Sequence, residues 1–120
     1  MGLDMYANFT TETIKQPVDF KVGSATQIHC WRKHPDLHGW MQHLYYDKGG
    51  QQDFNCVPVV LDLDDLDRLE LTMKAGSLPQ TQGFFFGTSD GTELDDDFDF
   101  LDKARRAIAE GYTVFYQAWW

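Results

Sequence analysis

Two histidines at helical spacing are the residues whose type and position most directly suggest chemistry. His34 and His38 stand four residues apart, and two imidazoles at that spacing on one helix face can share a metal ion. No third ligand is apparent, because Asp36 would lie on a different side of the helix and no zinc-protease pattern accompanies the pair. We therefore expect no metal and no other cofactor, and we interpret His38 as a partly buried histidine that hydrogen-bonds near a sheet.

A run of acids in the last third of the chain is the second candidate group of ligands. Seven acids fall between residues 90 and 102, and the alternating aspartates from Asp95 to Asp99 resemble the oxygen ligands of a calcium loop. The pattern then fails, since Phe100 stands where that loop needs a glycine and Arg106 where it needs a bidentate glutamate. We interpret the run as a solvated loop leading into a helix, whose N-terminus favours negative charge.

A cysteine nucleophile and a phosphate-binding loop are the remaining catalytic possibilities. Cys56 has no local signature that pairs it with a histidine base. We expect Cys30 and Cys56 to be buried, reduced thiols, because the chain lacks the cysteine density of small disulfide-rich folds. The sequence contains neither a Walker A loop nor a G-x-G-x-x-G loop.

Charge and hydropathy limit the classes of partner. The net charge of -9 and the presence of only ten basic residues argue against nucleic-acid binding, which depends on clustered lysine and arginine. No stretch approaches the ~20 apolar residues of a membrane span, and the first residues do not form a secretory leader. We expect no membrane association and a cytoplasmic location.

The elements that must position these residues follow from periodicity. Alternation of apolar and polar residues predicts strands over residues 3–7, 26–32 and 112–119. Phe84 to Phe86, between two glycines, predicts a short central strand. Pro58 places the apolar run 54–61 at a sheet edge or in a loop pressed on the core. The polar segment 10–25 predicts a loop that holds at most one short strand, around residues 18–22.

Apolar residues at i, i+3, i+4 and i+7 predict helices between the strands. The three expected helices run from His34 to Gly49, from Asp62 to Gly76 and from about Asp96 to Glu110. Asp62 and Asp65 form a near relative of the capping box at the start of the second helix.

Strands at both ends with helices between them predict one α+β domain over residues 1–120, with a mainly antiparallel sheet and about three helices on one face. The other face is then partly open. Polar and aromatic side chains could gather there as a binding surface, namely Asp4, Tyr6, His29, Trp31 and Gln117. The alternation alone does not decide which parity faces outward.

Five segments of the chain together form a distinctive pattern, namely Met1 to Tyr6, Trp31 to Lys33, His38 to Trp40, Leu78 to Gly87 and Tyr116 to Trp119. With these segments the chain resembles a family of small proteins found in bacteriophages, prophages and bacteria. Some members carry the label phosphoglycerate kinase, but that chemistry needs two large domains and a phosphate-binding loop, and this chain has neither the length for the domains nor such a glycine loop. The resemblance implies a phage-type origin, with the host cytoplasm as the expected location, and a shared fold.

The polar positions within the shared segments are our candidate ligand-binding residues, together with one tryptophan beside them. They are Asp4, Arg32, His38, Trp40, Thr81 and Gln82. An alternative interpretation is a hydrogen-bonded structural network that ties helix to sheet.

Three functions compete. The first is a non-enzymatic accessory protein that binds a small ligand or a host protein, and homodimerisation is compatible with it. The second is a small hydrolase or transferase in which His38 acts as general acid or base, Asp4 orients it and Arg32 holds an anionic group. The third is an acidic decoy that mimics nucleic acid through residues 62–67 and 90–102.

Overall fold

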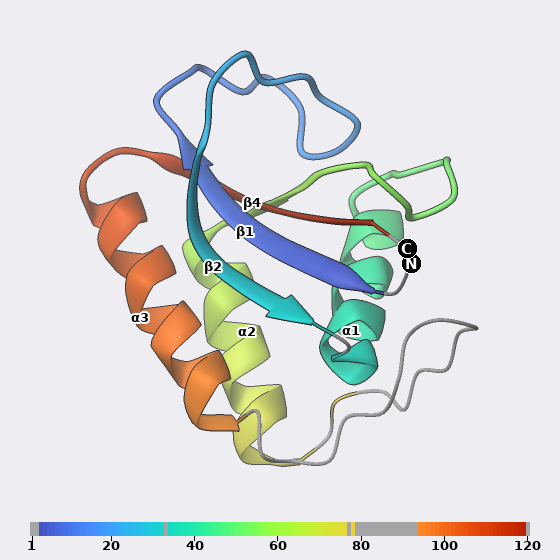
Figure 1. The fold of residues 1–120 in the computed structure, drawn as a ribbon, viewed down its shortest axis with the longest axis vertical. Helices are drawn as coiled ribbons and strands as arrows, with labels where there is room; N and C mark the ends of the chain where they lie inside the picture. The colour runs from blue at the N-terminus through green and yellow to red at the C-terminus, as the bar shows by residue number, and fades with distance from the viewer. Residues whose placement is uncertain (1–2, 33, 77, 79–93, 120) are drawn as a thin grey trace.

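The computed structural model describes residues 3–32, 34–76, 78 and 94–119 of the 120-residue chain (Figure 1). Within them, four strands form one antiparallel sheet in the order β2-β1-β4-β3. The strands are β1 (Asp4–Thr10), β2 (Thr26–Arg32), β3 (Val59–Leu61) and β4 (Thr113–Trp119). The first and last strands of the described chain therefore lie side by side at the centre of the sheet.

The helices of the described residues all lie on one side of this sheet (Figure 1). They are α1 (Pro35–Asp47), α2 (Leu63–Lys74) and α3 (Leu94–Ala109). Their buried faces join the inner side chains of the sheet in one core, which includes Met5, Leu37, Leu66, Phe100 and Tyr116. The predicted α+β class, with an antiparallel sheet and three helices on one face, is confirmed. None of these helices has the length and apolar character to cross a membrane.

The strand register decides which side chains face the helices. Along β1, Met5 and Ala7 are fully buried, whereas the residues between them are partly exposed. Met5 pairs with Trp31 and Ala7 with His29 across β1 and β2. Directly opposed residues share a face of the sheet, so Trp31 and His29 point toward the helices. The expectation that these two side chains belong to the outer face is therefore wrong.

Three of the expected outer-face residues do lie on the outer side. Asp4 and Tyr6 alternate with the buried positions of β1, and Tyr6 pairs with Gln117 of β4. Cys30 also pairs with Tyr6 and is exposed, as is Cys56. The prediction of buried thiols is thus wrong, because Cys30 has the outward parity of an edge strand and Cys56 lies in a surface loop.

The ends of α2 follow the capping signals in the sequence. The Asp62 carboxylate accepts a hydrogen bond from the Asp65 backbone N–H at 2.8 Å, and the Asp65 carboxylate accepts one from the Asp62 N–H at 3.0 Å. The capping box is therefore complete. Gly76 follows the helix at φ +65°, a conformation that glycine adopts readily.

Asp65 also anchors α2 to the end of α1. It is buried and accepts charge-assisted hydrogen bonds from Lys48 and Arg68. Burial raises the pKa of Asp65, but the bonds from Lys48, the Asp62 backbone and Arg68 outweigh it and hold that pKa below its usual value. The carboxylate thus stays ionised and fixes the two helices relative to each other.

The remaining elements depart from the sequence-based expectations in small ways. β1 extends to Thr10 because the residues after Ala7 also pair with β4. The segment 10–25 contains a single bridge, from Val18 to Val59, in place of a short strand. α3 begins at Leu94 because the acids that follow fill its first turn. The strand predicted at Phe84 to Phe86 lies outside the described residues.

Candidate functional site

The structure places Asp4 and Arg32 next to each other but separates both from His38. Asp4 pairs in register with Arg32 of β2 and with Trp119 of β4. Asp4 has the outward parity of β1, whereas His38 is fully buried on the helix side of the sheet. The sheet therefore lies between the carboxylate and the imidazole. This geometry does not support a site in which Asp4 orients His38.

His38 is instead part of a buried aromatic cluster. Its Nδ1 is hydrogen-bonded to the Tyr116 hydroxyl at 2.7 Å, and its ring stacks on Phe54 with centroids 5.0 Å apart. Burial lowers the pKa of His38 from 6.5 to about 4 and raises the pKa of Tyr116 well above 10. Both groups are neutral at neutral pH. This cluster agrees with the interpretation of His38 as a hydrogen-bonded histidine near the sheet.

The other candidate residues do not join these. Trp40 is half-buried on α1 and borders a groove of about 430 Å³ between α1 and α2, with His43, Arg68 and Leu71. Thr81 and Gln82 lie outside the described residues. The candidates Asp4 and Trp40 therefore do not line a common cleft, because they lie on opposite sides of the sheet.

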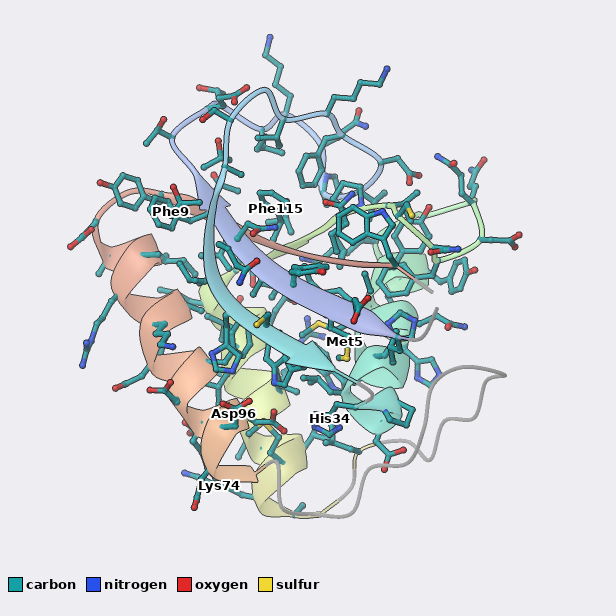
Figure 2. The ribbon with its side chains drawn as sticks, viewed as in Figure 1. Met5, Phe9, His34, Lys74, Asp96 and Phe115 are labelled. Carbon is teal, nitrogen blue, oxygen red and sulfur yellow. The ribbon has the colours of Figure 1, made fainter. Side chains whose placement is uncertain are left out.

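The structure does show a cleft, on the outer face of the sheet. It has a volume of about 570 Å³, and its floor is formed by Asn8 of β1 with Phe115 and Gln117 of β4. One wall comes from the loop between β1 and β2, and the other comes from the segment before β3. The residues of these walls are Phe20, Lys21, Val22, Ala25, Cys56 and Pro58. Figure 2 shows Phe115 beside the β1–β2 loop, whereas Met5 lies on the helix side.

Hydrogen bonds hold one wall against the floor, and a ring contact holds the other. The Cys56 N–H donates to the Ala118 carbonyl at 2.8 Å, and the Gln117 side-chain amide donates to the Cys56 carbonyl at 2.8 Å. On the other side, the Phe20 ring packs edge-on against Phe115 with centroids 5.4 Å apart. Tyr45 donates to the Asp19 carboxylate at 2.6 Å and so ties the loop to α1.

Sequence reasoning found only part of this cleft. Gln117 was expected on an outer face, but Phe20 and Lys21 were hidden in a polar loop without periodicity. Adjacent aromatic and cationic residues within such a loop are the only signal that could have identified them. Their distance from β4 along the chain conceals the contact that the fold creates.

A second polar cluster lies where α3 meets β2 and α1. Asp97 is only 2% exposed, and its two oxygens accept hydrogen bonds from Trp31 Nε1 and His34 Nε2, each at 2.8 Å. The interpretation of this acid as solvated is wrong, because the inward parity of Trp31 brings a buried donor to it. Figure 2 shows the neighbouring Asp96 at the start of α3 and His34 at the start of α1.

The same cluster continues toward solvent. His29 Nε2 lies 2.9 Å from Asp96 Oδ2, and its Nδ1 lies 3.4 Å from Lys103 Nζ. Within the described ranges, no three histidine, cysteine or acidic side chains are grouped so as to hold a metal ion. The arrangement joins α3 to β2 and to the start of α1 through hydrogen bonds.

Comparisons with protein-family models, with curated proteins and with solved structures found no match to this chain.

Replacing Asp97 tests the structural importance of the buried carboxylate. Asp97→Asn removes the charge and leaves Trp31 or His34 facing an amide N–H₂, so we expect unfolding to become easier by about 3 kcal/mol. Asp96→Asn, on the neighbouring and 53% exposed carboxylate, is the matched control and should cost no more than about 1 kcal/mol. Urea unfolding measures both, and equal losses would contradict the assigned role of Asp97.

Acid sensitivity tests the burial of His38. The unfolded chain binds a proton at this histidine near pH 6.5, while the folded chain does so only near pH 4. The contribution of neutral His38 to the free energy of unfolding is therefore fully present above pH 6.5. About 3 kcal/mol of that free energy is lost as the pH falls to 4. His38→Asn lowers stability overall but should remove this part of the pH dependence. His43 is exposed, so His43→Asn should keep the full pH dependence of stability. The free energy of unfolding in urea is measured between pH 4 and 6.5. If it falls with pH in His38→Asn as steeply as in the unaltered protein, the assignment is wrong.

Proposed function

We propose that this chain is a small-molecule-binding protein whose site is the cleft on the outer face of the sheet. The observation that carries the proposal is the cleft of about 570 Å³, a volume within the ~300–1,000 Å³ of ordinary ligand sites. Four segments of the chain build it, and Asn8, Gln117 and Lys21 give it polar groups that can orient a ligand. Phe20 and Val22, both half-buried, give it apolar surface.

The side chains of the cleft favour binding over acid–base catalysis. The described residues that line it include no carboxylate and no imidazole. Cys56 is the one thiol among them, and partial burial raises the pKa of this thiol above its usual value. Because the thiolate is the reactive form, Cys56 is a weak nucleophile at neutral pH. A ligand held here would therefore leave unchanged.

Backbone strain beside the cleft also supports a functional role. Two non-glycine residues of the described chain have positive φ, Asp19 at 55° and Cys56 at 64°. Each such residue costs ~1 kcal/mol or more, and strain of this kind concentrates at ligand sites. Asp19 directly precedes Phe20, and Cys56 lines the opposite wall. The fold thus sustains strain on both sides of the same cleft.

Probe binding followed by NMR tests this proposal. Three single-ring probes, benzoate, benzamide and benzylamine, are titrated into ¹⁵N-labelled protein at millimolar concentrations, where compounds of this size bind. We expect at least one of them to move the backbone amide resonances of Val22, Ala25 and Gln117. Asn8→Trp, which fills the floor of the cleft, should abolish these shifts.

Thr72→Trp is the matched control, because Thr72 lies in the other groove, between α1 and α2. This variant should bind the probes as the unaltered protein does. The proposal is contradicted if no probe moves the resonances of the cleft, or if the probes move only those around Thr72.

A further inference from the structure

The charge of the cleft is opposite to that of the protein as a whole. The chain carries a net charge of -9, yet Lys21 is the one charged side chain among the described residues that line the cleft. Lys21 makes no ion pair with any residue in the described part of the chain. An ammonium group in this position can therefore pair with a negative group of a ligand.

The apolar part of the cleft is centred on the half-buried ring of Phe20. This ring meets Phe115 at 86°, with centroids 5.4 Å apart, and Phe115 is itself only 3% exposed. Aromatic rings prefer edge-to-face or offset-stacked neighbours, so a planar ring entering the cleft can pack against the exposed part of Phe20. Lys21 follows Phe20 directly in sequence, which places the cation beside the aromatic wall.

From these two features we infer that the ligand of the cleft is a small aromatic carboxylate. Its ring packs on Phe20, and its carboxylate pairs with the Lys21 ammonium. Gln117 completes the site: its side-chain N–H₂ is held by the Cys56 carbonyl at 2.8 Å, which orients its Oε1 as an acceptor for a polar substituent. This inference rests on the proposed ligand-binding function and specifies the chemical class that the cleft selects.

The test compares the affinities of the same three probes in two lysine variants. Benzoate, benzamide and benzylamine share one ring and differ in the charge of the substituent. We expect benzoate to bind about fivefold more tightly than benzamide, as an exposed ion pair allows. Lys21→Gln should reduce the affinity for benzoate to that for benzamide and leave benzamide unchanged.

Lys15→Gln provides the matched control, since Lys15 lies in the same loop but borders a different cavity. It makes the same change in net charge and should leave the preference for benzoate in place. Added sodium chloride should weaken the binding of benzoate and not that of benzamide, because only the ion pair is screened.

The two proposals fail in different ways. If benzamide or benzylamine binds in the cleft as tightly as benzoate, or if Lys15→Gln and Lys21→Gln have the same effect, the assignment of an aromatic carboxylate is overturned while ligand binding stands. If no probe moves the resonances of the cleft in any variant, the proposed function falls, and the ligand class falls with it.

Discussion

A buried carboxylate holds the helices to the sheet. Asp97 lies in the first turn of α3, where the helix dipole favours its charge, and it accepts hydrogen bonds from Trp31 of β2 and from His34 at the start of α1. Taking an ionised carboxylate out of water costs several kcal/mol, which such bonds must offset. Because three elements meet at this one group, their relative positions depend on its two donors remaining in place. Core residues between these elements pack beside Asp97. For example, the ring centroids of Phe100 and Trp31 lie 4.8 Å apart.

The inner face of the sheet is covered by the helices, whereas the outer face carries the cleft. Tyr116 and His38 fill the helix side with a neutral hydrogen-bonded pair, so a solute cannot reach that imidazole without opening the core. Phe115 and Gln117 flank Tyr116 along β4 and therefore point to the outer face, where they form part of the floor of the cleft. One strand thus contributes alternate side chains to stability and to the candidate site.

The sequence predicts the helices and most of the strands, but it does not predict which face of each strand the helices cover. β2 was predicted with its observed bounds, and the Asp62 capping signal located the start of α2. Alternation shows that a strand has two faces without showing which one is covered, so Trp31 was assigned to the wrong side. Asp97 was misread for the same reason: an acid at a helix start has the same pattern whether solvated or buried, and its donor Trp31 lies 66 residues away. The phage-family resemblance and the roles suggested for Thr81 and Gln82 stay predictions.

The cleft could not be predicted because loops build its walls, yet the loops are not loosely held. Thr10 donates to the Ser24 carbonyl at 2.8 Å, and the Glu12 carboxylate accepts from the N–H groups of Gly23 and Ser24. These bonds close the base of the loop between β1 and β2, while Tyr45 holds its middle through Asp19. A loop fixed at both places loses little conformational entropy when a ligand binds. The acids of this loop therefore fix the wall of the cleft, and Lys21, which makes no ion pair within the described residues, is the cation of the proposed ligand site.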